Sequence, residues 1–273
     1  MRIVAYCLVV GLGYSLSWSF LNSFSTQSAW ELLAGVLLAA VFVPVVRWSS
    51  FNRGQLLGVI WIVLWYVGSA NLLIEGSIFI ERTVAEFWHE AVTDLVCFTV
   101  VAVLLVLLAK PFCIRAQQSV PASTPFRPSG RSLAWRIPSA VFAYLFLYFL
   151  FGSLMYTLFF RPFYTDPTMP LRDNQEVAAM LGLWFVPIQI GRALGIVLVS
   201  LPIAYSLRVI RPILALTLAL ILWVVGGFSS LVVPGSWPPA LRFYHSVEIL
   251  LQNGGLAIVL VWLFRLQKAR RTS

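Results

Sequence analysis

Eight stretches of the chain are almost continuously apolar, and each is long enough to cross a lipid bilayer as a helix. A membrane helix needs about 20 mostly apolar residues, because the hydrocarbon core is about 30 Å thick and a helix rises about 1.5 Å per residue. The stretches do not alternate between polar and apolar residues, which excludes a membrane β-barrel. The pattern therefore predicts transmembrane helices at 3–21, 30–46, 56–78, 92–109, 137–160, 184–206, 212–233 and 244–264.

The first apolar stretch follows Arg2, as the apolar part of a signal peptide would follow a basic residue. It ends in Ser19-Phe20-Leu21-Asn22-Ser23, which lacks the small-x-small pattern of a cleavage site. We expect this segment to be retained as a helix. Its cleavage would leave the orientation of the other seven spans unchanged.

The composition is that of a membrane protein. Of the 273 residues, 60% are hydrophobic and 11% are charged, whereas soluble domains carry roughly 25% charged residues. Aromatic residues make up 15% of the chain, which excludes a disordered, collagenous or coiled-coil protein. We therefore predict an all-α polytopic membrane protein of eight transmembrane helices, with the lipid bilayer as its first partner.

The Lys and Arg residues fall mostly on one side of the predicted spans. Fourteen of the 19 fall on the side of the two termini, four fall on the other side, and Arg192 falls inside a span. Because positively charged loops stay in the cytoplasm, we expect both termini there, with the protein in a bacterial inner (plasma) membrane. All ten acidic residues and both histidines fall toward the outer side. The net charge of +9 follows from this topology and does not indicate nucleic-acid binding.

A linker rich in Pro, Ser and Arg at 110–136 divides the chain into two halves of four spans, 1–109 and 137–273. The halves resemble each other weakly at an offset of 158 residues, which pairs Leu64-Trp65-x-Val67-Gly68 with Leu222-Trp223-x-Val225-Gly226, Pro44 with Pro202, and Glu31 with Gln189. Phe87-Trp88-His89 also recurs, as Phe243-Tyr244-His245. Two copies with an even number of spans would be parallel repeats about an axis along the membrane normal, and their interface is the natural place for a site.

Two outer segments lie between the predicted spans. Residues 80–91 are typical of a short interfacial helix that leads into the fourth span. Residues 161–183 form a longer loop, which we expect to be a plain connector; the alternative is a lid over the outer face.

Arg192 lies about 12 Å inside the sixth span at the helical rise per residue. An unpaired Arg at that depth costs about 2.5–3.5 kcal/mol, so the side chain should face a partner or water. Gln189 lies on the same helix face, and the third span offers Asn71 and Glu75, one turn apart. We expect Glu75 to pair with Arg192. The alternatives are a purely structural ion pair and a Glu75 that reaches the membrane surface.

The last span carries the densest polar cluster, formed by Arg242, His245, Glu248, Gln252 and Asn253. At about 100° per residue, these side chains lie within an arc of about 140° on one helix face, which must meet protein or water. Two interpretations stay open, a ligand site and a hydrogen-bonded packing seam.

Metal binding is a minor alternative. Glu86 with His89 and His245 with Glu248 each place a carboxylate and an imidazole one helical turn apart, and with two further glutamates, Glu31 and Glu75, these residue types resemble the ligands of carboxylate-bridged di-metal bundles. The three cysteines have no spacing typical of a disulfide framework or a metal site. Phosphate loops, dinucleotide fingerprints and nucleophile elbows are missing from the sequence, and we expect no cofactor.

The segment Pro238-Pro239-x-x-Arg242-x-x-His245-x-x-Glu248-x-x-x-x-Asn253 resembles a pattern of uncharacterised bacterial multi-spanning membrane proteins. Phe163-Tyr164 after the fifth span, and Gln189-x-x-Arg192 before Leu201-Pro202, share this resemblance. The family brings no known activity. The resemblance implies that Gln189, Arg192, Arg242, His245, Glu248 and Asn253 belong to one site.

Three functions are consistent with these patterns. In the first, an outward-facing polar site binds a small polar or anionic ligand or a lipid headgroup, as in a transporter or a sensor, through Arg192, Gln189, Arg242, Asn253 and Asn71. In the second, a membrane-embedded enzyme acts at the outer leaflet with His245, Glu248 and Glu75 as its acid–base groups. In the third, the protein is a structural or assembly subunit whose polar residues only join helices.

Overall fold

The protein is described by a computed structural model that covers residues 1–22, 27–112, 130–166, 169, 171–172, 174–235 and 237–265. Within these residues, eight helical segments are long and apolar enough to cross a membrane, and they confirm the predicted all-α polytopic fold. Cys113 and most of the linker predicted at 110–136 lie outside the described residues.

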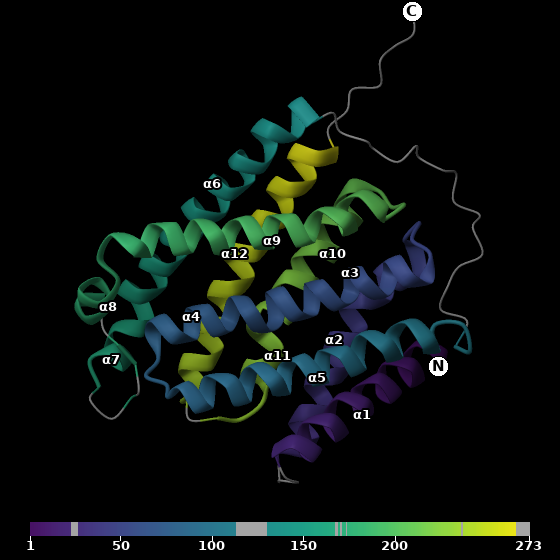
Figure 1. The fold of residues 1–273 in the computed structure, drawn as a ribbon, viewed down its shortest axis with the longest axis horizontal. Helices are drawn as coiled ribbons and strands as arrows, with labels where there is room; N and C mark the ends of the chain where they lie inside the picture. The colour runs from purple at the N-terminus through teal and green to yellow at the C-terminus, as the bar shows by residue number, and fades with distance from the viewer. Residues whose placement is uncertain are drawn as a thin grey trace, which may run out of the picture.

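The spans, shown in Figure 1, are built from these elements: α1 (Arg2–Asn22), α2 (Ser28–Trp48), α3 (Arg53–Trp65) with η1 (Tyr66–Ala70) and α4 (Asn71–Phe79), α5 (Val84–Leu108), α6 (Gly130–Met155) with η2 (Tyr156–Phe160) and α7 (Arg161–Tyr164), α8 (Asn174–Leu181) with η3 (Gly182–Trp184) and α9 (Phe185–Ser206), α10 (Arg211–Trp223) with η4 (Val224–Phe228) and α11 (Ser229–Val232), and α12 (Pro239–Arg265). The segments η1 and η2 are single wide π-helical turns inside otherwise α-helical spans. The segment η4 is a wide turn that is kinked at Gly227, whose φ of 156° is not helical.

Two outer segments differ from their predicted structure. The segment 80–91 is not a separate interfacial helix, because α5 starts at Val84 and continues without a break to Leu108. A capping box fixes this start, since the side chains of Thr83 and Glu86 each accept a hydrogen bond from the backbone of the other. The loop 161–183 is more than a connector, because it contains α7 and α8, and Leu171 pairs with Ile80 in an isolated antiparallel bridge.

The offset of 158 residues recurs in the structure. Helix α3 begins at Arg53 and ends at Trp65, and α10 begins at Arg211 and ends at Trp223. The π-helical segments η1 and η4 and the ends of α2 and α9 are related by the same offset. These bounds relate the second and third spans of the first half to those of the second half.

The loops that follow α2 and α9 meet each other at one end of the molecule. Ser49 and Leu207, which are equivalent at the offset of 158, form an isolated antiparallel bridge. The backbone N–H of Ser50 donates to the carbonyl of Ser206 at 3.1 Å, and the N–H of Arg208 donates to the carbonyl of Trp48 at 3.1 Å. These two hydrogen bonds are counterparts of each other under the same offset.

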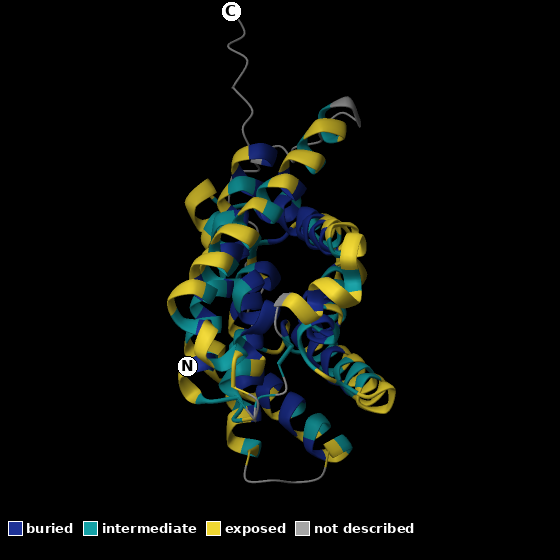
Figure 2. Ribbon diagram, turned by 90° about the vertical axis from the view of Figure 1, so that its left-hand side faces the viewer, coloured by how far each residue is buried: buried dark blue, intermediate teal, exposed yellow. Residues whose placement is uncertain are grey.

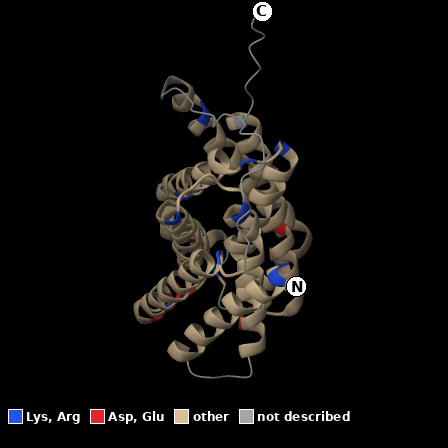
Figure 3. Cartoon of the chain, turned by 90° about the vertical axis from the view of Figure 1, so that its right-hand side faces the viewer, with Lys and Arg blue, Asp and Glu red and all other residues tan. Residues whose placement is uncertain are grey.

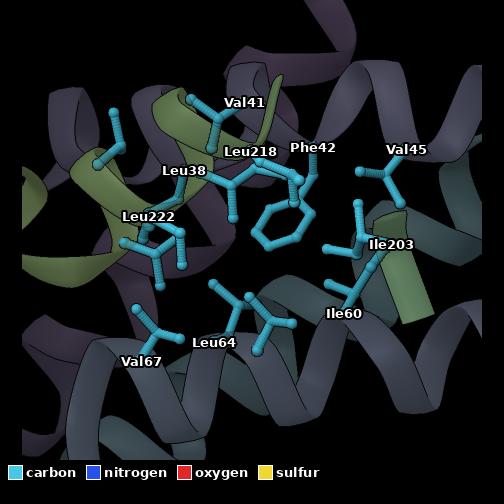
Figure 4. Packing of buried hydrophobic residues seen from close by; sticks show 14 of the residues in the cluster. Leu38, Val41, Phe42, Val45, Ile60, Leu64, Val67, Ile203, Leu218 and Leu222 are labelled. Atoms are coloured by element: carbon cyan, nitrogen blue, oxygen red, sulfur yellow. The ribbon is translucent and has the colours of Figure 1, made fainter. Parts of the chain in front are cut away.

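The central core lies where α2, α3, α9 and α10 meet. Figure 4 shows side chains of this core from both halves. Some of them are equivalent at the offset of 158 residues, such as Ile60 and Leu218, or Leu64 and Leu222. These four residues are almost fully buried. The packing closes this part of the molecule, since it leaves apolar side chains in mutual contact between the two halves.

The two ends of the helix bundle differ in charge. One end carries α7, α8 and the start of α5, and Figure 2 faces it. We call it the acidic end, because the described Asp and Glu residues lie in the helix turns and loops there. Figure 3 faces the opposite end, with Lys and Arg drawn in blue. We call it the basic end, because the described helix ends and loops on that side carry Arg47, Arg53, Lys110, Arg208 and Arg211.

Candidate functional site: a polar cavity at the acidic end

A cavity of about 1080 Å³ lies at the acidic end and is lined by residues of both halves. Its wall includes Glu31 of α2, Glu75 of α4 and Glu248 of α12, together with Leu171 and Val177 of the 161–183 segment. The cavity is larger than the 300–1,000 Å³ that is typical of small-molecule sites. It therefore has room for a ligand that reaches from one half to the other.

The lining combines carboxyl groups with aromatic rings. Five acidic residues line the cavity, Glu31, Glu75, Glu90, Asp94 and Glu248, beside three basic ones, Arg82, Arg242 and His245. The aromatic lining residues are Tyr14, Trp18, Phe79, Phe98, Tyr148, Phe149, Tyr156, Phe160, Tyr164, Phe185 and Trp237. Such a surface suits a ligand that has both an apolar body and a polar group.

Arg192 binds the partners that the sequence predicted for it. Its Nη2 donates to Glu75 Oε2 at 2.6 Å, its Nη1 donates to Gln189 Oε1 at 2.6 Å, and its Nε donates to Asn71 Oδ1 at 3.0 Å. Its guanidinium carbon also lies 5.6 Å from the ring centre of Tyr148. Every face of this guanidinium group is thus held by protein, which is how a charge deep in a membrane span is compensated.

Arg192 does not itself line the cavity, whereas Glu75 does. The Arg192 side chain is 1% exposed and that of Glu75 is 25% exposed. The other carboxylate oxygen of Glu75 accepts a hydrogen bond from the Tyr148 hydroxyl at 3.2 Å. Arg192 and Tyr148 therefore hold the Glu75 carboxylate in place at the cavity wall, and Glu75 is the member of this network that can meet a ligand.

A glycine lets the helices that carry this network approach each other closely. Helix α9 crosses the π-helical turn η1 at Gly195, where a Cβ atom would overlap the Tyr66 ring. The Tyr66 hydroxyl donates toward the carbonyl oxygens of Gly191 and Arg192, at 3.3 Å each. This contact fixes the depth of Arg192 relative to Asn71 and Glu75.

His245 and Glu248 form a pair on the wall contributed by α12. His245 Nδ1 lies 2.9 Å from Glu248 Oε2. With its proton on Nδ1, the ring donates to the Glu248 carboxylate, and the neutral form of the ring then has a lone pair on Nε2. The His245 ring contacts those of Trp237 and Phe160, at 5.5 and 6.0 Å between centres. The imidazole, 27% exposed, is thereby held in a fixed orientation beside the cavity.

The remaining residues of the predicted α12 stripe divide between the cavity and the packing. Arg242 lines the cavity, and its Nη1 donates to the carbonyl oxygens of Leu231 and Val233 at 3.2 and 3.3 Å. Asn253 is buried and donates from Nδ2 to the carbonyl of Leu222 at 2.9 Å, just before the wide turn η4. Asn253 thus satisfies a backbone group next to an irregular helix turn and is not a lining residue.

The four residues of the alternative metal site do not gather. Glu86 serves the capping box of α5, and His89 Nε2 lies 2.8 Å from Asn22 Oδ1 on the surface. His245 and Glu248 lie on the cavity wall, which neither Glu86 nor His89 lines. Among the described residues, no three His, Cys, Asp or Glu side chains are close enough to hold a metal ion.

Several lining residues were missed by the sequence analysis. Tyr148 orients Glu75, yet in the sequence it is one of many aromatic residues in an apolar span. Asp94 and Trp18 line the cavity from α5 and α1. Asp94 lies nearly three helical turns inside α5 from its start, and this depth was the available signal for a carboxylate in the span.

Comparisons with protein-family models, with curated proteins and with solved structures find no match to this chain.

Proposed function

We propose that this protein binds a polar or amphipathic molecule in the cavity at the acidic end, as a transporter or a sensor, and that this end faces away from the cytoplasm. The observation that carries the proposal is the cavity of about 1080 Å³ between the halves of an eight-span helical protein, with ionisable side chains on its wall. Ionisable residues inside spans are costly and mark ligand or ion pathways. The bias of Lys and Arg toward the basic end supports the orientation.

The charges on the wall favour an uncharged or cationic ligand over an anionic one. Arg192 does not line the cavity, and its guanidinium group is already paired with Glu75. Arg82 donates to Glu90 at 2.5 Å, and Arg242 donates to backbone carbonyl oxygens. An anion would therefore meet five carboxyl groups, while Arg242 is the one lining guanidinium group that forms no ion pair among the described residues.

A substitution that narrows the cavity tests the proposal. Gly152 of α6 faces Glu248, since a Cβ atom there would lie 3.4 Å from Glu248 Oε1. We expect a ligand bound at about 100 times its Kd to stabilise the wild-type protein by about 2.7 kcal/mol and to stabilise Gly152→Phe much less. The measurement is the unfolding midpoint of purified protein in lipid nanodiscs, with molecules extracted from the wild-type preparation added back.

Gly58→Phe is the matched control, because Gly58 is a helical glycine of α3 with no atom within 4 Å of a Cβ. It should respond to the ligand as the wild type does. The proposal fails if no extracted molecule stabilises the wild type, or if Gly152→Phe responds as strongly as Gly58→Phe.

The geometry of His245 favours an enzyme as the second candidate. A histidine whose Nδ1 is hydrogen-bonded to a carboxylate and whose Nε2 has a lone pair is arranged as a general base. An enzyme of this kind would act on a bound molecule at the outer leaflet, with Glu75 as a further acid–base group. His245→Ala should then abolish conversion of the bound molecule and retain its binding, whereas His89→Ala, on the surface, should leave both unchanged. Conversion that survives in His245→Ala would refute this candidate.

A further inference from the structure

The cavity wall has two parts with different chemistry. One part is formed by Glu75, Tyr148, His245 and Glu248. We call the other part the Glu31 pole; it consists of Tyr14 and Trp18 of α1, Glu31 of α2, and Asp94 and Phe98 of α5. The Glu31 pole lies entirely in the first half of the chain. Neither ligand binding at Glu75 nor catalysis by His245 gives it a role.

Glu31 is a buried carboxyl group that has no countercharge within the described part of the chain. Its equivalent in the second half at the offset of 158 is Gln189, which bonds to Arg192 three residues later. In the first half, the residue three positions after Glu31 is the buried Ala34. Glu31 is 2% exposed and accepts one hydrogen bond, from Ser19 Oγ to its Oε2 at 3.1 Å.

Glu31 nevertheless lines the cavity, and it forms no ion pair among the described residues. A buried carboxylate with a single hydroxyl donor is strongly destabilised unless a proton or a cation neutralises it. The free side of this carboxyl group points to a ligand as the source of that cation.

Asp94 adds a second carboxyl group to the same part of the wall. It also forms no ion pair within the described part of the chain. Arg82 is the basic side chain on this side of the cavity, and its guanidinium group, packed against Gly76, donates to Glu90. Among the described residues, three of the five lining carboxyl groups thus have a basic partner, and the two without one, Glu31 and Asp94, share the Glu31 pole.

Aromatic rings complete this part of the wall. The Tyr14 ring is stacked between Trp18 and Phe98, with centres 6.2 and 6.5 Å away. Aromatic faces attract ammonium groups through the ring quadrupole, and Trp attracts them most strongly. Carboxyl groups next to Trp and Tyr are the combination that recognises an organic cation.

We propose that the Glu31 pole binds the ammonium group of an organic cation that has an apolar body, with Glu31 and Asp94 as its anionic contacts and Trp18 as its aromatic contact. This inference rests on the proposed function, since it names the ligand class of the same cavity. The apolar body of the ligand lies along the aromatic wall toward Tyr148.

The test is calorimetric titration of the full chain in lipid nanodiscs, with nanodiscs lacking protein as the blank. The probes are 2-phenylethylammonium, neutral 2-phenylethanol and anionic phenylacetate, each with NaCl at matched ionic strength. We expect the ammonium probe to bind more tightly than the other two. Glu31→Gln and Asp94→Asn should each weaken it by about tenfold or more, the effect of losing one charged hydrogen bond.

A stability measurement and three further variants separate charge and aromatic contact from folding defects. Gln at position 31 still accepts from Ser19, so Glu31→Gln should keep the unfolding midpoint of the wild type. Glu81→Gln, at an exposed residue off the cavity wall, should bind the ammonium probe unchanged. Trp18→Leu should bind it about fivefold more weakly, and Trp18→Phe should recover most of that loss.

The inference is overturned if 2-phenylethanol binds as tightly as the ammonium probe, or if Glu31→Gln and Asp94→Asn bind this probe like the wild type. It is also overturned if Na⁺ displaces the ammonium probe at equal concentration, because that result would indicate an inorganic cation site. If the neutral or anionic probe binds and Gly152→Phe abolishes that binding, the cavity is a ligand site and only the ammonium assignment fails. If no probe binds and Gly152→Phe shows no difference from Gly58→Phe in the stability assay, both proposals fail.

Discussion

Polar side chains in the spans of this protein are of two kinds. Arg192, Gln189 and Asn71 are sealed between α9 and the α3–η1–α4 span, and Arg192 donates to both of the others. Glu75 and Glu31 reach the cavity wall. The distinction matters because a sealed group acts on folding, whereas a lining group can act on a ligand. Arg192 belongs to the first kind and acts on a ligand only through Glu75.

Arg192→Ala should destabilise the protein rather than change its ligand preference. Removing one partner of a buried ion pair costs about 3–5 kcal/mol, because the remaining charge stays buried. We expect much lower abundance and a broadened size-exclusion profile for Arg192→Ala.

The double variant Arg192→Gln/Glu75→Gln removes both charges and should recover a large part of the lost yield. If Arg192→Ala is as abundant and monodisperse as the wild type, the pair of Arg192 and Glu75 contributes nothing to folding. That result would contradict the structural role assigned to Arg192.

The sequence allowed the Arg192 network to be predicted, because an Arg in a span needs a partner and helical spacing leaves few candidates. It did not allow the role of Tyr148 or of the Glu31 pole to be predicted. Tyr148 looks like any aromatic residue of a span, and the missing counterion of Glu31 becomes visible only when Ala34 is compared with Arg192 in the folded halves. Spacing along one helix predicts faces, but not which faces of different helices share a cavity.

At the scale of elements, the offset of 158 that pairs short motifs in the sequence also pairs helix ends, π-helical turns and the bridge between Ser49 and Leu207. The wide turns themselves were not predicted, because one extra residue in a helix turn leaves no mark in hydropathy. The structure of the 161–183 segment was also not predicted, since the pairing of Leu171 with Ile80 depends on tertiary structure.

The Ser49–Leu207 bridge offers a test of whether the basic end opens. The flanking hydrogen bonds make this a non-hydrogen-bonded antiparallel pair, for which Cα atoms are about 4.5 Å apart, within the range for a disulfide. Ser49→Cys/Leu207→Cys, in a background without the native cysteines, should form a disulfide on mild oxidation, and each single variant should not. Gel mobility under non-reducing conditions measures this.

The oxidised double variant then separates a transporter from a sensor. A transporter must open the basic end, so the disulfide should stop flux of the bound molecule in proteoliposomes and reduction should restore it. A sensor should keep its ligand-induced stabilisation and show no flux in either state. Failure of the disulfide to form would show that the loops after α2 and α9 do not meet.

On the scale of the whole molecule, the halves are closed at the basic end by the paired core of Figure 4 and separated at the acidic end by the cavity. The eight spans could be predicted from hydropathy alone, since each is a continuous apolar run. The cavity could not, because its lining residues come from helices that lie far apart in the sequence. The central claim is that this cavity is accessible from the acidic end.

Modification of Ser229→Cys by a small, charged methanethiosulfonate reagent tests this claim most directly. Ser229 is buried but lines the cavity, whereas Ser200 is also buried but lies in the core and donates to the carbonyl of Ile196 at 2.7 Å. In a cysteine-free background in nanodiscs, mass spectrometry should show rapid modification of Ser229→Cys and none of Ser200→Cys. If Ser229→Cys is as unreactive as Ser200→Cys, the cavity is closed to polar molecules and the proposed ligand site is contradicted.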